Sequence, residues 1–180
     1  MASRIIFLDF DGPLSNHRVT FATGDMKAFD PVTIAMLNKI CELTEAKIVC
    51  TSTRAPLNHP DSHCNTMRRF TEARLDLRYL HEDWSCRYDN GPREGHIEKW
   101  LAAHPEVTES VTIDDKAVAV PNMIRVDPYN GLTVQDAIKI LKVFGVDPQE
   151  FFNDIGRRNK GNDDPAYRVS KIKLPPASPS

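Results

Sequence analysis

Residues 5–16 read IIFLDFDGPLSN, an apolar run that ends directly in two acids. If the run is a strand, the side chains of Asp9 and Asp11 leave the extended backbone on the same side, because they are two residues apart. Gly12 allows a sharp turn and a close approach of backbone amides to a ligand. This stretch therefore predicts a buried strand with a polar site at its carboxyl end.

Two other segments repeat this pattern. Residues 48–50 (IVC) run into Thr51-Ser52, and residues 111–113 (VTI) run into Asp114-Asp115. Continuous apolarity, rather than alternation, is typical of strands that are buried on both faces in a parallel sheet. Because the carboxyl ends of parallel strands share one edge of a sheet, we expect these polar residues to converge with Asp9.

Helical patterns fill the intervals between these strands. The clearest begins at Pro31, a residue suited to the first turn of a helix, and continues to Glu45 with apolar residues on one face. Further helices are expected at 66–75, 94–103 and 133–144, and further short strands near 77–81 and at 123–126. Residues 13–30 are expected to form a loop that carries an exposed His17. This order of elements predicts an α/β fold with an open parallel sheet flanked by helices.

The size and composition of the chain suit one soluble domain. The chain has 180 residues, of which 41% are hydrophobic and 27% are charged. No apolar run approaches the roughly 20 residues that span a bilayer, and the N-terminus lacks the pattern of a secretory signal. We therefore expect a cytoplasmic protein that does not contact a membrane.

The charge is nearly balanced overall but uneven along the chain. The formal net charge of −2 argues against indiscriminate binding of nucleic acid. Residues 156–180 contain six basic and two acidic residues and four prolines, with little apolar periodicity. We therefore divide the chain into a domain at 1–155 and a basic extension at 156–180, which is either a solubilising tail or an arm that contacts phosphates.

The four cysteines are expected to be reduced thiols. They contain no CxxC pair, and two of them lie inside apolar segments. A zinc cluster from His59, His63, Cys64 and Cys86 can be written down, but no ligand pair repeats with finger-like spacing, so we do not favour it. Trp84 is expected to pack in the core or a lid, with stacking on a nucleic-acid base as the alternative.

The converging acids indicate a site for a hard cation. Two carboxylates at one strand end repel each other unless they share a cation or a proton. Mg²⁺ would relieve this repulsion, and Asp114-Asp115 from a neighbouring strand would supply further oxygen ligands. One carboxylate could then attack phosphorus while the other passes a proton to the leaving oxygen, with Thr51 and a cation holding the phosphoryl oxygens. Taken alone, Asp9 and Asp11 are equally consistent with a simple turn or a calcium-type loop.

The four motifs together resemble those of the haloacid-dehalogenase (HAD) superfamily. They are DFDG after a strand, a strand ending in Thr or Ser, a basic residue before a helix, and a strand ending in DD, and the resemblance covers roughly residues 4–145. The stretches KIVCTSTR, GPREGHIEKWLAAHPEV, VTIDD and GLTVQDAIKIL look similar to small HAD domains of phage proteins and RNA-repair proteins. The resemblance implies a HAD-like (Rossmannoid) sheet and an aspartyl-phosphate mechanism.

The resemblance also implies a role for each matching residue. Asp9 would be the nucleophile that accepts the phosphoryl group, Asp11 the general acid and base, and Thr51 the hydroxyl that holds phosphate, with Ser52 as its substitute. Mg²⁺ would be held by the Asp9 side chain, the backbone carbonyl of Asp11, and Asp114, with Asp115 a direct ligand or one acting through water. Gly12, Ser52 and Arg54 would contact the substrate.

The basic motif departs from the family pattern. Arg93 stands where the family has a lysine, just before the expected helix at 94–103. Arginine can bridge a nucleophile and a phosphate with two nitrogens, so Arg93 is the expected replacement. Lys99 and Lys116 are lesser candidates for the same role, and a plain surface position at the helix start is the alternative for Arg93.

The segments between the four motifs leave room for only a small lid over the site, or for none. An open site admits a large substrate such as a nucleic-acid end, whereas a small lid can enclose a nucleotide. We therefore expect a Mg²⁺-dependent phosphatase acting on a nucleotide or on a nucleic-acid terminal phosphate. The alternative, suggested by the replacement at Arg93, is a non-catalytic HAD-like domain that binds a phosphorylated ligand or partner.

Overall fold

A computed structural model describes residues 3–52, 60–86 and 91–153, with residues 60–64 described by their backbone alone. Arg54, His59 and the extension at 156–180 lie outside the described residues, as do the side chains of His63 and Cys64. Within the described chain, every helix is too short or too polar to cross a lipid bilayer.

The sheet has five parallel strands in the order β3-β2-β1-β4-β5. Its strands are β1 (Ser3–Leu8), β2 (Lys47–Cys50), β3 (Leu80–Ser85), β4 (Val107–Asp114) and β5 (Met123–Arg125). β1 lies at the centre and pairs with β2 and β4, with Leu8 level with Cys50 on one side and Ile113 on the other. The predicted α/β fold with an open parallel sheet is therefore confirmed.

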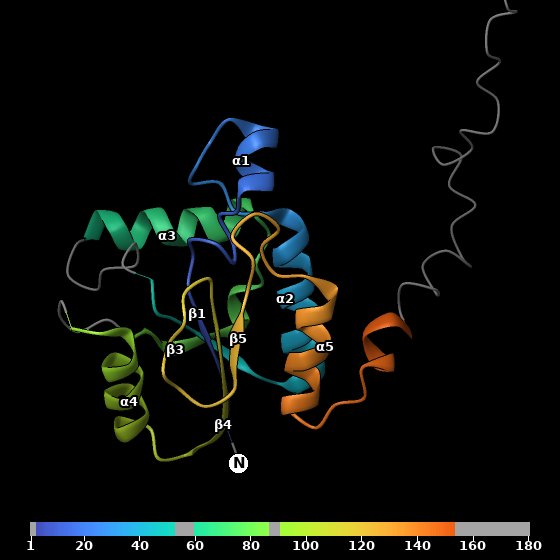
Figure 1. Cartoon of the computed structure of the whole chain (residues 1–180). Helices are drawn as coiled ribbons and strands as arrows, with labels where there is room; N and C mark the ends of the chain where they lie inside the picture. The colour runs from blue at the N-terminus through green and yellow to red at the C-terminus, as the bar shows by residue number, and fades with distance from the viewer. Residues whose placement is uncertain (1–2, 53–59, 87–90, 154–180) are drawn as a thin grey trace, which may run out of the picture.

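Helices cover both faces of this sheet (Figure 1). α2 (Pro31–Thr44) and α5 (Val134–Val143) lie side by side on one face, and α4 (Arg93–Ala103) lies on the other. α1 (His17–Thr23) projects beyond the carboxyl edge of the sheet, and α3 (Pro60–Glu72) runs across this edge. The carboxyl edge of the sheet is therefore the side on which α1 and α3 lie.

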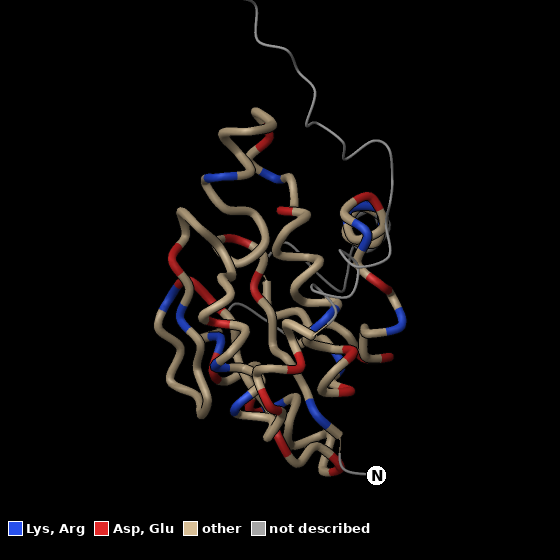
Figure 2. The backbone as a smooth tube through the Cα atoms, turned by 90° about the vertical axis from the view of Figure 1, so that its right-hand side faces the viewer, with Lys and Arg blue, Asp and Glu red and all other residues tan. Residues whose placement is uncertain are grey.

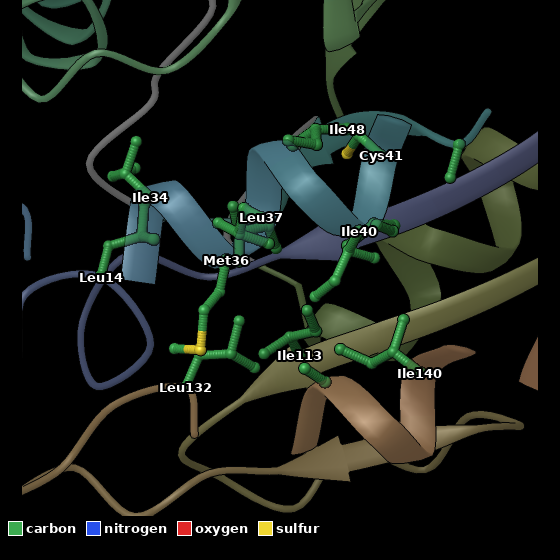
Figure 3. Packing of buried hydrophobic residues seen from close by; sticks show 14 of the residues in the cluster. Leu14, Ile34, Met36, Leu37, Ile40, Cys41, Ile48, Ile113, Leu132 and Ile140 are labelled. Atoms are coloured by element: carbon green, nitrogen blue, oxygen red, sulfur yellow. The ribbon is translucent and has the colours of Figure 1, made fainter. Parts of the chain in front are cut away.

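Continuous apolarity in β1 supplies two cores, one on each face. Ile6 and Leu8 belong to the larger cluster with α2 and α5, whereas Ile5 and Phe7 belong to the smaller cluster with α4. Figure 3 shows apolar side chains of α2 packed against those of the neighbouring strand, helix and loops. Phe7 meets the fully buried Trp100 of α4 edge to face, with ring centroids 5.4 Å apart. Both faces of β1 are therefore buried, as its sequence predicts.

Local capping sets where the principal helices begin. The Asp30 side chain accepts a hydrogen bond from the Val32 amide, with Pro31 in the first turn of α2. Thr133 and Asp136 form a reciprocal capping box at the start of α5. The helices predicted at 31–45, 94–103 and 133–144 are confirmed within a residue or two at each end.

Other predicted boundaries were wrong. Residues 13–30 are not simply a loop, because α1 is capped by the Asn16 side chain, which accepts a hydrogen bond from Val19 N at 2.9 Å. α3 begins six residues before the predicted start at Thr66 and ends at Glu72. Residues 77–79 form a 3₁₀ turn, and β3 follows it as a largely polar edge strand without the apolar run that marks the other strands.

The described cysteines and Trp84 are placed as the sequence predicts. Cys41, Cys50 and Cys86 are buried free thiols, as expected for reduced cysteines. Trp84 is half-buried against the larger core cluster, in agreement with a packing role. Figure 2 shows that basic and acidic positions are interspersed along the described backbone.

Candidate active site

The loops after β1, β2 and β4 meet at the carboxyl edge of the sheet. The Asp9 amide donates to the carbonyl of Ile113 at 3.0 Å, and the Thr51 amide donates to the carbonyl of Leu8 at 2.9 Å. Asp9, Thr51 and Asp114 are all buried. Parallel pairing therefore brings together the polar residues that the sequence places after three separate strands.

Arg93 connects two of these loops from the first residue of α4. Its Nη1 donates to Oδ2 of Asp9 at 2.8 Å, and the same nitrogen lies against Oδ2 of Asp114. The Arg93 side chain is only 18% exposed, whereas Lys99 and Lys116 are exposed residues. Of the three basic residues considered from the sequence, Arg93 is the one for which a contact with Asp9 is seen.

Three carboxylates form a group that could hold a metal ion. Asp9, Asp114 and Asp115 each place one ligand atom within 4.8 Å of the others. Asp115 Oδ1 is buried and accepts no hydrogen bond from any described residue. A buried carboxylate oxygen without a donor, beside two further carboxylates, fits the oxygen ligands that Mg²⁺ prefers. The side chain of Asp11 is outside this group, which is compatible with the expectation that its backbone carbonyl is the ligand.

Gly12 permits the close approach of the first loop to Asp115. Gly12 has φ of +90°, and a Cβ atom added there would lie 2.5 Å from Cβ of Asp115. Such a distance is too short for any side chain to be accommodated without a shift of the loop. The glycine after the second acid is therefore required by the packing of two loops as well as by the turn.

Burial and hydrogen bonding change the pKa of Asp9 in opposite directions. Burial raises the pKa of its carboxyl group above the ordinary value, and the neighbouring Asp11 adds to this rise. The Arg93 guanidinium, the Phe10 amide and the Ser52 hydroxyl lower the pKa without cancelling the effect of burial. Arg93 is thus the largest single influence that favours the charged carboxylate.

The two hydroxyls after β2 differ in their partners. Ser52 donates a hydrogen bond to Asp9, whereas Oγ1 of Thr51 is buried and meets no hydrogen-bond partner among the described residues. A buried hydroxyl without a partner is unfavourable unless a ligand supplies one. Thr51 is therefore placed to receive a ligand oxygen, and Ser52 orients the Asp9 carboxylate. Arg54, predicted to contact substrate, lies outside the described residues.

An aromatic cluster beneath the site could not be read from the sequence. Phe10 follows Asp9 and packs edge to face on Phe29 and Phe70, with ring centroids 5.2 and 5.5 Å away. Phe70 belongs to α3, so the cluster connects this helix to the first loop.

His17 is exposed as predicted, but it is the first residue of α1, and its ring stacks on that of Tyr129 with centroids 4.5 Å apart.

The site combines an acid after the central strand, a hydroxyl after β2, a cation at a helix start and paired acids after β4. This combination defines a HAD-type α/β domain. A family model described as the HAD domain in Swiss Army Knife RNA repair proteins matches residues 5–137, and the chain belongs to this family. HAD domains are generally phosphatases and typically use Mg²⁺. No curated protein and no solved structure matches the chain.

Proposed function

We propose that this protein is a Mg²⁺-dependent phosphohydrolase that forms an aspartyl-phosphate on Asp9. The observation that carries the proposal is the contact of Arg93 with Asp9 and Asp114, in the same group of carboxylates as Asp115. The buried Asp9 carboxylate lies beside both a guanidinium and a group of carboxylates that could hold a cation. Two positive charges at one point suit a substrate with several negatively charged oxygens, such as a phosphate ester. The unpartnered Thr51 hydroxyl supports the same conclusion, because it offers a donor to such an oxygen.

In the first step an oxygen of Asp9 attacks the substrate phosphorus. The new bond joins this oxygen to phosphorus, while the bond from phosphorus to the leaving oxygen breaks. Asp11 gives a proton to the leaving oxygen, which departs as a hydroxyl. In the second step a water molecule attacks phosphorus, Asp11 takes a proton from it, and the bond to Asp9 breaks to release phosphate.

The surrounding residues hold the phosphoryl group during both steps. Arg93 would meet the charge of the phosphoryl oxygens from one side, and Thr51 would donate its hydroxyl proton to another oxygen. Mg²⁺ held by Asp9, the Asp11 carbonyl, Asp114 and Asp115 would neutralise charge on the carboxylates and on the phosphate. Gly12 would bring backbone amides close to the substrate, with Ser52 and Arg54 as further contacts.

The family and the rim of the site both support one class of substrate. The family's description names RNA repair, which supports a nucleotide or a nucleic-acid terminal phosphate as substrate. α1, of seven residues, and α3, of thirteen, are the two helices at the carboxyl edge, which supports a small lid. The exposed Lys27, shortly after α1, could contact a polyanion.

A panel of phosphate esters tests the proposal. The full chain is incubated with Mg²⁺ and with mononucleotides, sugar phosphates and oligonucleotides bearing a 3′- or 5′-phosphate, and released phosphate is measured. We expect hydrolysis of nucleotides or oligonucleotide ends that stops in EDTA and in Asp9→Asn. Asp25→Asn, a change at an exposed acid outside the site, is the matched control. Binding of these esters without turnover would favour the non-catalytic alternative.

A further inference from the structure

A second group of metal-ligating side chains lies away from the proposed active site. His81, His104 and Glu106 each place one ligand atom within 4.8 Å of the others. His81 belongs to β3, His104 follows the last residue of α4, and Glu106 precedes β4. Arg93 is the first residue of α4 and His104 follows its last, and the eleven residues of this helix extend about 16 Å along its axis. This group is therefore separate from the carboxylates that contact Arg93.

Packing against Trp100 holds the two imidazole rings in place. The His104 ring stacks on the Trp100 ring with centroids 3.7 Å apart, and the His81 ring meets Trp100 edge to face at 5.0 Å. The two imidazole rings are themselves 5.2 Å apart. Because Trp100 is fully buried, it is a fixed support for both rings. The two imidazole ligands are thus held in place by the core, whereas the third ligand, Glu106, is an exposed residue beside them.

The hydrogen bond of His104 leaves one nitrogen available to a metal. Nδ1 of His104 lies 2.8 Å from the carbonyl oxygen of Trp100. A carbonyl oxygen only accepts, so Nδ1 carries the proton and Nε2 has a free lone pair in the neutral ring. A backbone carbonyl that accepts from the remote nitrogen is the usual way in which metal-binding histidines are oriented.

His81 must change its hydrogen bonding to bind a metal through Nε2. The Asp83 amide donates to Nδ1 of His81 at 3.0 Å, so the proton of the neutral ring sits on Nε2. Coordination through Nε2 would move that proton to Nδ1 and release the Asp83 amide. The Asp83 carboxylate, 3.7 Å from Nε2 of His104, adds negative charge beside the ion. Metal binding would therefore leave a signature at the Asp83 amide.

We propose that His81, His104 and Glu106 form a site for a divalent transition-metal ion of the zinc type. Two imidazoles and one carboxylate suit Zn²⁺, whereas Mg²⁺ prefers ligand sets made of oxygen. The ion would join the edge strand β3 to the junction of α4 and β4, so it would stabilise the fold. This proposal is independent of the phosphohydrolase function, because none of its ligands belongs to that site.

Zinc titration of the full chain tests this site. Calorimetry with ZnCl₂ is performed in excess Mg²⁺, so that Mg²⁺ competes with Zn²⁺ for the carboxylate group at the other end of α4. We expect Glu106→Gln, which leaves both rings on Trp100, to lower the Zn²⁺ affinity by about tenfold or more. His104→Ala should have a similar effect, whereas His17→Ala, at an exposed histidine outside the group, should bind Zn²⁺ as the wild type does.

Two further measurements make the test decisive. In EDTA, the wild type and Glu106→Gln should unfold at the same midpoint temperature. Zn²⁺ should raise the midpoint of the wild type by more than it raises the midpoint of Glu106→Gln. In amide NMR spectra, the Asp83 resonance should shift on addition of Zn²⁺ to the wild type. Equal Zn²⁺ affinity in the wild type and Glu106→Gln would overturn the site. An unchanged Asp83 resonance in Zn²⁺-bound protein would overturn coordination through Nε2 of His81.

Discussion

Arg93 and Asp9 are joined by a hydrogen bond of 2.8 Å from Nη1 to Oδ2, although they lie 84 residues apart in the chain. The Asp9 side chain is 4% exposed and that of Arg93 is 18% exposed, so solvent screens this pair weakly. Removing one partner of a buried pair leaves the other as an uncompensated charge. The pair therefore influences both the stability of the domain and the chemistry proposed for it.

Arg93→Ala should lower kcat by about a hundredfold, because one charge contact to the phosphoryl oxygens is lost. Arg93→Lys should retain part of the rate, since a lysine keeps the charge but loses the planar fork. Phosphate release under saturating Mg²⁺ measures the effect, and circular dichroism checks the fold. Lys99→Ala, at an exposed position of α4, is the control. Normal turnover in Arg93→Ala, with a large loss in Lys99→Ala or Lys116→Ala, would show that the cation was assigned wrongly.

Asp9→Asn should abolish turnover and keep the fold, because Asp114 remains as a charged partner of Arg93. The amide oxygen of asparagine can still accept from the Phe10 amide, as Oδ1 of Asp9 does at 2.8 Å, but it is a poor nucleophile. Rates of phosphate release and far-UV circular dichroism together provide the test. In the wild type, mass spectrometry of acid-quenched protein should detect a phosphoryl adduct on Asp9. Hydrolysis at the wild-type rate in Asp9→Asn would exclude the covalent mechanism.

Asp114→Asn should weaken Mg²⁺ binding by about tenfold or more and by a larger factor than Asp115→Asn. Asp114 is fully buried and, like Asp9, contacts Arg93, whereas Asp115 is partly exposed. Asparagine at 114 can still accept from the Lys116 amide, which Oδ1 of Asp114 does at 2.8 Å, so the loop should keep its shape. Titration of each variant with Mg²⁺, followed by calorimetry, measures the difference. A larger effect in Asp115→Asn would make Asp115 the principal ligand.

Gly12→Ala should destabilise the domain more than Gly24→Ala. Both glycines have positive φ, +90° and +73°, so both changes strain the backbone. Only at Gly12 would the new Cβ meet another residue, Asp115, and this clash should add about 1–3 kcal/mol to the loss of unfolding free energy. Urea unfolding of the two variants isolates the contribution of the clash. Equal losses would mean that the loop moves away from Asp115 without cost.

Asp30 should contribute stability that disappears in acid. Burial acts to raise its pKa, but hydrogen bonds from Arg18, Asn16 and the Val32 amide lower the pKa below the ordinary value of 3.8. A lowered pKa in the folded state means that the contribution is complete above 3.8 and is lost as pH falls through the folded value. The difference in unfolding free energy between the wild type and Asp30→Asn should therefore shrink between about pH 5 and pH 3. A difference that grows toward low pH would contradict this assignment.

Much of the fold could be predicted because its signals are local. Three continuous apolar runs end in polar residues, and each became a buried strand of the parallel sheet, since burial on both faces imposes that pattern. The Pro31 start of α2 and the Thr133 start of α5 are likewise written in neighbouring residues. β3 was predicted only approximately, near 77–81 instead of Leu80–Ser85, because an edge strand covered partly by water needs no apolar run to mark its bounds.

The functional groups of the site could be read from the sequence alone: acids after the first and third apolar runs, hydroxyls after the second and a basic residue before a helix. The choice of Arg93 over Lys99 and Lys116 as the residue that contacts Asp9 depends on the packing of α4, which places its first residue at the carboxyl edge of the sheet. The same holds for the group of His81, His104 and Glu106, which joins a residue of β3 to two residues of the link between α4 and β4. Distances between such elements depend on how helices pack against the sheet, and no local pattern records them.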